Sequence, residues 1–248
     1  MSSSFQNQVL ADLRPEDRAA LEPHLVQVTL AKGEILTEQD CPVDQVYFPE
    51  TADLGNVMTF PDGRAVETST VGSEGVSGLA AFLAKAPCTW RIVVQIEGTA
   101  WRLDADVFRK QVEASPVLLN RALQLTHDYQ SQAAQTAACN AIHEVAPRLA
   151  RWLLLVQDRT RQTEILLTQG DIATLLGVQR TTINAAASEL RAGGAIEYRR
   201  GKVRIRSRDA LEGLSCTCYQ AQRRRSEALG IVTDLQRSDA AAAGAVPA

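Results

Sequence analysis

The sequence contains few aromatic residues, cysteines, histidines or methionines, and it has no long apolar run. Only 5% of its 248 residues are Phe, Trp or Tyr, and it has five cysteines, three histidines and two methionines. No apolar stretch approaches the roughly 20 residues of a membrane-spanning helix. The first residues, MSSSFQNQVL, lack the basic and apolar regions of a secretory signal. We therefore expect a cytoplasmic protein with no membrane partner, whose cysteines stay reduced.

Motifs for catalysis and metal binding are also missing. The sequence has no nucleophile elbow, P-loop or zinc-protease motif, so it does not predict an enzyme. Cys216-Thr-Cys218 is the one close cysteine pair, whereas metal and cluster sites usually use C-x₂-C pairs within sets of four ligands. We find no carboxylate or cysteine at metal-ligand spacing from any of the histidines, which are His24, His127 and His143. The sequence thus predicts no metal and no cofactor. Structural cysteines are expected, with redox sensing by Cys139 or the Cys216–Cys218 pair as the alternative.

Charge is distributed unevenly along the chain. Residues 1–147 carry 10 Lys and Arg against 19 Asp and Glu, whereas residues 148–225 carry 15 against 7. The later segment is therefore basic although the whole chain has a formal net charge of −3. This asymmetry favours a nucleic-acid-binding segment joined to an acidic sensor segment.

The most informative stretch is TQGDIATLLGVQRTTINAAASEL, from Thr168 to Leu190. It predicts two short helices around a tight turn at Gly177, where a positive φ reverses the chain. Thr168 and Asp171 have the spacing of a capping box. Apolar residues recur in the second helix at i, i+3, i+4 and i+7, at Ile183, Ala186, Ala187 and Leu190. This pattern is typical of a helix-turn-helix, with an ordinary helical hairpin of a core as the alternative.

The opposite face of the second helix has one arginine, small polar groups and no acid, which suits the major groove of DNA. An arginine in this place can make a bidentate hydrogen bond to guanine, and we assign that role to Arg180. The predicted DNA-binding residues of the two helices are Thr168, Gln179, Arg180, Thr181, Thr182, Asn184 and Ser188.

A basic hairpin follows directly. In Ala195–Arg206, AIEYRRGKVRIR, the second arm alternates apolar and basic residues, and Gly201 marks the turn. Beside a helix-turn-helix it predicts a wing whose Arg199, Arg200 and Lys202 contact phosphates. The alternative is a solvated edge hairpin whose charges prevent aggregation.

The N-terminal part predicts many short strands. Val26–Leu30, Val46–Phe48, Val57–Phe60, Ala65–Val71, Ile92–Ile96 and Ala100–Leu103 are separated by turn residues, the pattern of an antiparallel barrel or roll. A helix is expected around Gln8–Leu21, and another after Asp104. Gly72–Gly78, GSEGVSG, precedes a short helix at Leu79–Leu83, where backbone amides could hold a phosphate.

A long helix is predicted from Pro116. Leu118, Ala122, Leu125, Tyr129, Ala133 and Thr136 follow one another at helical spacing. We interpret the first five as a dimer seam, with packing on the chain's own barrel as the alternative. Cys139-Asn140 is predicted to be a hinge, followed by a helix over Arg148–Asp158 in which Trp152 fills the core.

These motifs resemble the Crp/Fnr family of bacterial transcription regulators. The resemblance rests on LTQGDIATLLGVQRTTI, IEYRRGKVRI and CTCY, and on YFPE, DGRAVETSTVGSEGVSGL and the helix that ends before RLARWLLL. It covers nearly the whole chain. It implies a cyclic-nucleotide-binding-type β-roll, a dimer helix and a winged helix that binds two-fold symmetric DNA. The cyclic-AMP-responsive branch has a glutamate and a second arginine where this chain has Thr181 and Ala185, so the flanking base preference should differ.

The resemblance also implies an effector pocket. Its candidate residues here are Gly72, Ser73, Glu74, Gly75, Ser77, Gly78, Cys88 and Thr89. A cyclic-AMP-binding member has a glutamate, an Arg-Ser pair and a Thr-Ser pair where this chain has Gly78, Cys88-Thr89 and Ala133-Ala134. Arg91 lies three residues too late to replace that arginine. Because an unneutralised buried phosphate is costly, we expect no useful binding of cyclic AMP.

The sequence as a whole predicts an α+β protein. We expect a β-roll sensor domain at 1–115, a dimerisation helix at 116–138, a winged helix-turn-helix domain at 139–225 and a disordered tail at 226–248. The predicted function is that of a homodimeric transcription regulator whose partners are double-stranded DNA, a second copy of itself and RNA polymerase. The alternative is an effector- or redox-gated module whose winged helix contacts protein rather than DNA.

Overall fold

The computed structural model describes residues 5–83 and 86–232, and they fall into two compact units. The first comprises the described residues up to Met58 together with Ser69–Gln130, and the second comprises Thr59–Thr68 together with the described residues from Ser131. In the described part of the chain, no helix is long and apolar enough to cross a membrane.

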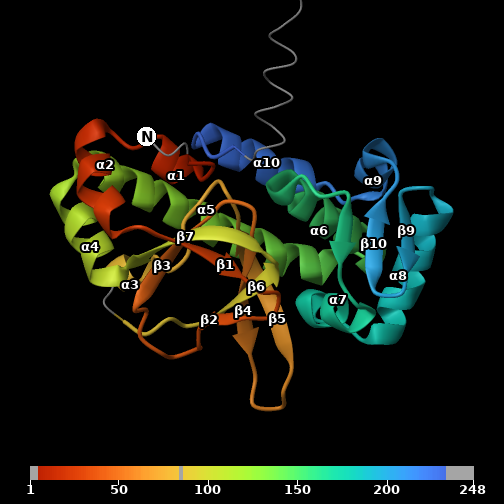
Figure 1. The fold of residues 1–248 in the computed structure, drawn as a ribbon. Helices are drawn as coiled ribbons and strands as arrows, with labels where there is room; N and C mark the ends of the chain where they lie inside the picture. Colours follow the sequence, from red (N-terminus) through yellow and green to blue (C-terminus); the bar gives the residue numbers. More distant parts are fainter. Residues whose placement is uncertain (1–4, 84–85, 233–248) are drawn as a thin grey trace, which may run out of the picture. The chain divides into compact units, whose positions relative to one another are not determined.

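Two antiparallel sheets build the β-roll (Figure 1). One has the order β1-β7-β3, from Val26–Leu30, Gly98–Asp104 and Gln45–Pro49. The other has the order β2-β6-β4-β5, from Ile35–Thr37, Arg91–Ile96, Asp53–Thr59 and Ala65–Val71. The predicted antiparallel roll is therefore confirmed. Strand β2 was not predicted, because three residues are too few to show an alternating pattern.

Short helices flank these sheets in the first unit. They are α1 (Gln8–Ala11), α2 (Pro15–Leu21), α3 (Ala80–Leu83) and α4 (Ala105–Ala114), with a 3-10 turn at Glu22–His24. Pro15 occupies the first turn of α2, where its missing N–H costs nothing. The Asp104 carboxylate caps α4 by accepting hydrogen bonds from two backbone amides. The helix predicted after Asp104 is therefore confirmed, whereas the one expected around Gln8–Leu21 is divided into α1 and α2.

Helix α5 extends from Pro116 to Ile142 and corrects two expectations. Cys139-Asn140 is not a hinge, since both residues are helical and Cys139 is buried. The stripe assigned to the dimer seam is not free either, because Leu118, Ala122 and Leu125 are buried within the chain itself. The alternative, in which this stripe packs on the protein's own fold, holds for these three residues.

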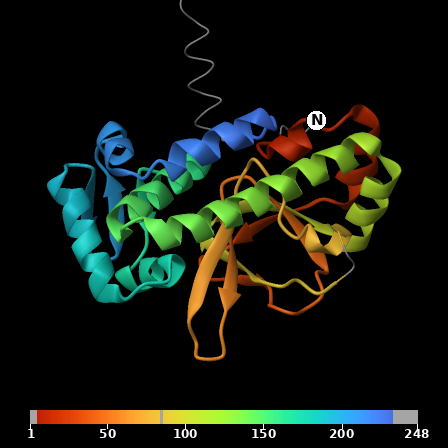
Figure 2. The same ribbon diagram turned by 180° about the vertical axis from the view of Figure 1, so that it is seen from behind.

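Tyr129, further along the same stripe, also faces the chain's own first unit. Its hydroxyl accepts a hydrogen bond from the Val76 amide at 3.1 Å and donates one to the Val76 carbonyl at 3.0 Å. Ala133 is half-buried, as is Thr136. In Figure 2 the first half of α5 runs along the strands of the roll. The periodic apolar stripe therefore identified the inner face of α5.

The outward face of α5 has a second regular stripe. Exposed residues recur at alternating spacings of three and four, at Asn120, Leu123, His127, Gln130, Ala134, Ala137 and Ala141. This spacing is the one that lets two helices pack along a common seam. Its side chains are small or polar, so hydropathy alone did not reveal it.

The second unit is a winged helix. Its elements after α5 are α6 (Val145–Thr160), β8 (Glu164–Leu166), α7 (Gln169–Leu176), α8 (Arg180–Ala192), β9 (Ile196–Arg199), β10 (Lys202–Ile205), α9 (Arg208–Leu214) and α10 (Cys218–Ala228). The sheet order is β8-β10-β9, so the predicted hairpin has a third strand that was not expected. Trp152 of α6 is buried as predicted, and its Nε1 also donates to the Glu67 carboxylate at 3.1 Å.

The chain remains helical beyond Arg225, where the sequence predicts loss of pattern, because α10 continues to Ala228. The rest of the tail predicted to be disordered, from residue 233 onward, lies outside the described residues.

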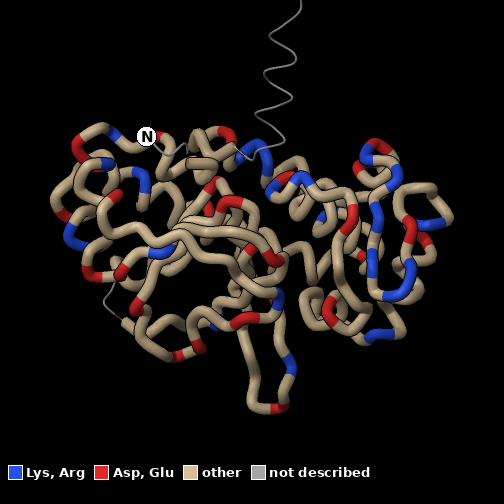
Figure 3. The backbone as a smooth tube through the Cα atoms, in the orientation of Figure 1, with Lys and Arg blue, Asp and Glu red and all other residues tan. Residues whose placement is uncertain are grey.

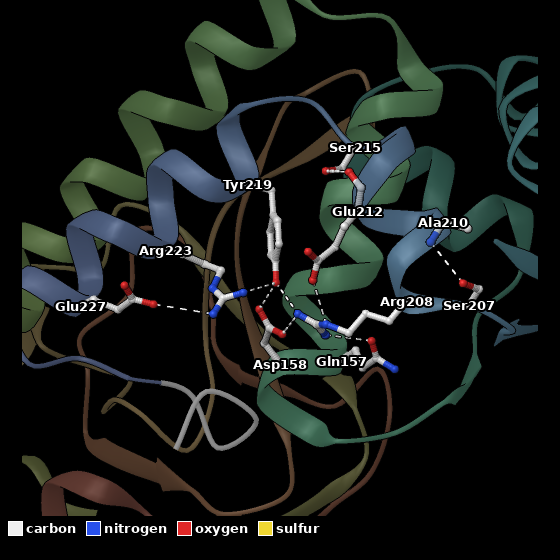
Figure 4. Close-up of polar contacts among 10 residues, drawn as sticks. All are labelled: Gln157, Asp158, Ser207, Arg208, Ala210, Glu212, Ser215, Tyr219, Arg223 and Glu227. Atoms are coloured by element: carbon white, nitrogen blue, oxygen red, sulfur yellow. Dashed lines mark hydrogen bonds and ion pairs between the residues drawn. The ribbon is translucent and has the colours of Figure 1, made fainter. Parts of the chain in front are cut away.

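A buried polar network joins three helices of the second unit (Figure 4). The Tyr219 hydroxyl of α10 donates to Asp158 Oδ2 of α6 at 2.8 Å, and Arg208 of α9 pairs with Asp158 Oδ1 at 2.7 Å. Arg208 also donates to Gln157 Oε1 and pairs with Glu212. Burial raises the pKa of Asp158, but the adjacent Arg208 guanidinium and the Tyr219 hydroxyl favour its ionised form. The network therefore fixes α9 and α10 against the end of α6.

Candidate nucleic-acid interface and effector pocket

The turn between α7 and α8 has the geometry that the sequence predicted. The Thr168 hydroxyl accepts from the Asp171 amide at 3.1 Å, and the Asp171 carboxylate accepts from the Thr168 amide at 2.9 Å, which completes the capping box. Gly177 ends α7 with φ +64°, a conformation that favours glycine. A Cβ there would also lie 2.9 Å from a methyl group of Val66. The turn thus depends on glycine for both conformation and space.

Helix α8 buries one side and exposes the other. Ile183, Ala186, Ala187 and Leu190 are buried, as predicted. The predicted DNA-facing residues of this region are all exposed, namely Thr168, Gln179, Arg180, Thr181, Thr182, Asn184 and Ser188. Arg180 is the first residue of α8, and the N-terminal residues of a recognition helix are those that reach base edges. Arg180 is therefore exposed at the first turn of α8.

The wing turns tightly at Arg200-Gly201, where both residues have positive φ angles, +49° and +78°. Two positive φ angles are characteristic of a type I′ hairpin turn, whose twist matches that of the flanking strands. The Tyr198 hydroxyl donates to the Leu167 carbonyl at 3.2 Å, and this contact links the wing to the segment before α7. Figure 3 shows Lys and Arg positions concentrated along β9, β10 and their turn.

Acidic residues partly neutralise the wing. Lys202 Nζ lies 2.9 Å from Glu164 Oε1 of β8, and Arg199 Nε lies 3.2 Å from Glu197 Oε1. The bond from Lys202 lowers the pKa of Glu164, which therefore stays ionised. These pairs are exposed, so each stabilises the fold only weakly. A phosphate would compete with them for the two cations.

The glycine-rich loop of the first unit uses its backbone groups internally. The amides of Gly72, Gly75 and Ser77 donate to Glu74 Oε1, the Gly72 carbonyl and the Tyr47 carbonyl respectively. The side chain of Asn7 donates to the Gly75 carbonyl at 2.8 Å. All residues of the loop are buried, including the predicted Ser73 and Gly78.

Tyr129 of α5 also lies directly against the loop. A Cβ on Gly75 would lie 2.2 Å from the Tyr129 hydroxyl. This contact and the internal hydrogen bonds place the protein's own groups against the loop. They occupy the position that the sequence suggested for a phosphate.

The other predicted pocket residues do not supply a cation. The Cys88 side chain is buried, and its backbone exchanges hydrogen bonds with the Asp40–Cys41 turn. Thr89 is exposed. Arg91 pairs with Glu38 at 2.8 Å and is thus already engaged by a carboxylate.

Comparison with known proteins agrees with both halves of this description. A family model described as a Crp-like helix-turn-helix domain matches residues 147–214, and one described as a cyclic nucleotide-binding domain matches residues 27–115. The chain belongs to the Crp/Fnr family. It is a Crp-like transcription regulator with a helix-turn-helix DNA-binding domain.

Individual members of the family are distant relatives of this chain. A CRP-like cAMP-activated global transcriptional regulator of Mycobacterium tuberculosis is 24% identical over 82% of this chain and 91% of its own length. A crystal structure described as a Crp/Fnr-family regulator from Eubacterium rectale has a TM-score of 0.66 at 18% identity, covering 84% of this chain and 97% of that chain. The c-di-GMP responsive global regulator CLP of Xanthomonas campestris has a TM-score of 0.63 at 13% identity. The match covers 78% of this chain and 100% of that chain. These two structural likenesses show the Crp/Fnr fold alone.

Sequence reasoning missed one constellation in this Crp/Fnr protein. Cys139 lies in the last turn of α5, and His143 follows directly after the helix ends at Ile142, four positions after Cys139. The prediction that no histidine has a cysteine at metal-ligand spacing is therefore wrong. Cys216 and Cys218 lie beside them, and the ligand atoms of all four residues are within 4.8 Å of one another. The hydrogen bond with Cys139 lowers the pKa of Cys216 below that of a free thiol. The i, i+4 spacing of a cysteine and a histidine at the end of a helix was the signal available in the sequence.

Proposed function

We propose that this regulator acts as a homodimer that recognises a two-fold symmetric DNA site, and that cyclic AMP does not control it. The observation that supports DNA binding most directly is the exposed face of α8. It presents Arg180 at its first position and has polar, uncharged neighbours in Thr181 and Asn184. A bidentate contact from arginine to guanine contributes roughly 1–3 kcal/mol of discrimination against a wrong base.

The outward stripe of α5 supports the dimer. Leu123 is half-exposed on this stripe, and Ala134, Ala137 and Ala141 follow it as small residues that allow a close approach of two helices. A two-fold dimer would place two copies of α8 about 34 Å apart, one turn of DNA, so that each reads one half-site. The seam proposed here replaces the buried stripe that the sequence favoured.

The unresponsiveness to cyclic AMP is proposed from the filled loop. Tyr129 engages both polar backbone groups of Val76, and Arg91 is paired with Glu38. A bound cyclic phosphate would therefore have no free cation among the predicted pocket residues. The relatives named above are described as responding to two different nucleotides, so the fold does not determine the effector.

The primary test is selection of bound DNA from a random pool by purified, ligand-free protein. We expect enrichment of a two-fold symmetric site with a guanine in each half. Enrichment of a single asymmetric half-site would contradict the dimer, and salt-sensitive binding without enrichment would contradict recognition by the ligand-free form. An absence of DNA binding would favour the alternative, in which the winged helix contacts another protein.

Cyclic AMP is tested separately by calorimetric titration and by the DNA affinity of the same sample. We expect no heat of binding and no change in the dissociation constant for the selected site. Micromolar affinity for cyclic AMP, or DNA binding that requires it, would contradict the proposal.

A further inference from the structure

Four side chains that commonly bind metal ions meet where the end of α5 contacts the connection between α9 and α10. Cys139 lies in the last turn of α5, and His143 follows directly after the helix ends at Ile142. The His143 amide donates to the Cys139 carbonyl at 3.0 Å, which keeps the two residues one helical turn apart. Cys216 lies in the connection, and Cys218 begins α10. The four ligand atoms, three sulfurs and one imidazole nitrogen, all lie within 4.8 Å of one another.

The spacing of these atoms matches a single tetrahedral ion. With Zn–S bonds of about 2.3 Å and Zn–N bonds of about 2.0–2.1 Å, a tetrahedral site separates two sulfurs by about 3.8 Å, and a sulfur from a nitrogen by about 3.6 Å. Cys139 Sγ lies 3.6 Å from Cys216 Sγ, and Cys218 Sγ lies 3.6 Å from His143 Nδ1. The ligands of an iron–sulfur cluster bind different iron atoms and lie further apart than ligands that converge on one ion.

The surroundings suit a closed site. Cys139, Cys216 and Cys218 are buried and form an apolar cluster of their own, while His143 is half-buried. The protein thus supplies four ligands without a position for solvent, as in structural zinc sites rather than catalytic ones. Three thiolates and one imidazole are also the soft donor set that favours zinc.

Neighbouring polar groups would support the ligands. Gln135 Nε2 donates to Cys218 Sγ at 3.0 Å, and its Oε1 accepts from Arg225. Such second-shell hydrogen bonds orient metal ligands. Three thiolates around a divalent ion leave one net negative charge, and Arg151, buried beside Cys139 and Cys216, interacts with both of them electrostatically. The charge is therefore compensated within the fold.

We propose that Cys139, His143, Cys216 and Cys218 bind one zinc ion that fastens the start of α10 to the end of α5. The site also has a route to the helix-turn-helix. Arg148, which interacts electrostatically with Cys139 and Cys216, donates a hydrogen bond to the Leu176 carbonyl at the end of α7. Zinc would thus hold the base of the winged helix in place.

The test is the metal content of the full-length protein, purified with reductant and dialysed. Elemental analysis should find about one zinc per chain. Cys139→Ser and Cys216→Ser should each lower this content at least tenfold, whereas Cys41→Ser, which changes an exposed thiol in the sensor unit, should leave it unchanged.

A second measurement covers the case in which the serine variants fail to fold. Chelator-stripped wild-type protein, kept reduced, is titrated with Co(II), whose visible absorption bands report tetrahedral thiolate coordination. We expect these bands to appear at one equivalent and to be displaced by zinc. His143→Gln, a change at the half-buried ligand, should weaken Co(II) binding at least tenfold while the far-ultraviolet circular dichroism stays unchanged.

The assignment would be overturned if wild-type protein contained no zinc and gave no tetrahedral Co(II) spectrum. It would also be overturned if the protein contained iron with acid-labile sulfide in place of zinc. A Cys139–Cys216 disulfide that persists under reductant, or zinc retained in both serine variants, would have the same consequence. Each readout is independent of DNA binding, so failure of the zinc site and failure of the proposed function are distinguishable.

Discussion

At the scale of single residues, Arg180 is the position on which sequence recognition depends. Arg180→Ala should relax the preference at one base pair in each half-site, a loss of roughly 1–3 kcal/mol of discrimination, while affinity for unrelated DNA falls only slightly. The measurement is repeated selection from the random pool, followed by titration of single-base variants of the site.

Arg191→Ala is the matched control for that change. Arg191 is exposed on the same face of α8 but about three turns further along the helix, roughly 16 Å away. Arg191→Ala should weaken the affinity for all DNA sequences alike. If Arg180→Ala left the site preference untouched, α8 would not be the recognition helix in the way proposed.

Tyr219 is the residue on which the second unit's buried network converges (Figure 4). Its hydroxyl donates to Asp158 and accepts from Arg208 and Arg223, so Tyr219→Phe removes hydrogen bonds to three charged partners. We expect the free energy of unfolding to fall by about 1–3 kcal/mol, measured by chemical denaturation.

Tyr198→Phe provides the comparison, because this change removes only one hydrogen bond to a carbonyl. It should lower the free energy of unfolding by about 0.5–1.5 kcal/mol. Equal effects of the two changes would mean that the network around Asp158 contributes no more than one neutral hydrogen bond.

Residue-level prediction worked where the partners are near in sequence. The caps at Asp104 and Thr168 and the glycine at 177 follow from spacings of a few residues, and all three were predicted. The pairing of Asp158 with Arg208 joins residues fifty positions apart, and no local rule brings them together. The same holds for Cys139 and Cys216, whose meeting depends on the docking of helices that are distant in the chain.

At the scale of elements, the wing is a hairpin whose basic side chains are partly engaged by its own sheet. Lys202→Ala should lower the magnitude of the slope of log affinity against log salt by up to about 0.9, the value for one phosphate contact. Glu164→Gln should raise affinity for all sequences, because it releases Lys202 from its partner at 2.9 Å. Both are measured by titrating specific and unrelated DNA at several salt concentrations.

The control for the wing is Arg224→Ala, which removes one exposed positive charge from α10 instead. It should leave the slope close to that of the wild type. A slope that is the same in Lys202→Ala and wild-type protein would place the wing away from the DNA backbone.

Elements were predictable where they bury one clear face. The strands of the roll are short apolar runs between turn residues, and helix α8 buries apolar residues at helical spacing, so their positions follow from those patterns. Strands β2 and β8 have three residues each, too few for periodicity to appear. For α5 the periodicity was real but was assigned to the wrong contact, because the most apolar stripe of a helix is the one that its own chain buries.

At the scale of the whole molecule, the acidic and basic parts of the sequence correspond to the β-roll and the winged helix. This asymmetry was visible from composition alone, and the positive charge of the basic part favours an approach to DNA through the winged helix. Assembly was less visible. Apart from Leu123, the proposed seam consists of small and polar residues. It can be recognised only once the structure shows that the apolar stripe of α5 is buried within the chain.

The proposed dimer can therefore be tested at Leu123, the large apolar residue of the outward stripe. Leu123→Glu should give a monomer in light scattering, since it would place two carboxylates against each other across the seam. Because linked half-sites gain roughly 10²–10⁴-fold in affinity over one, affinity for the two-fold symmetric site should fall by a comparable factor, while affinity for unrelated DNA changes little. Val26→Glu is the control, because Val26 on β1 is 48% exposed and Leu123 49%. A dimeric Leu123→Glu protein that keeps its symmetric-site affinity would mean that the two copies meet elsewhere.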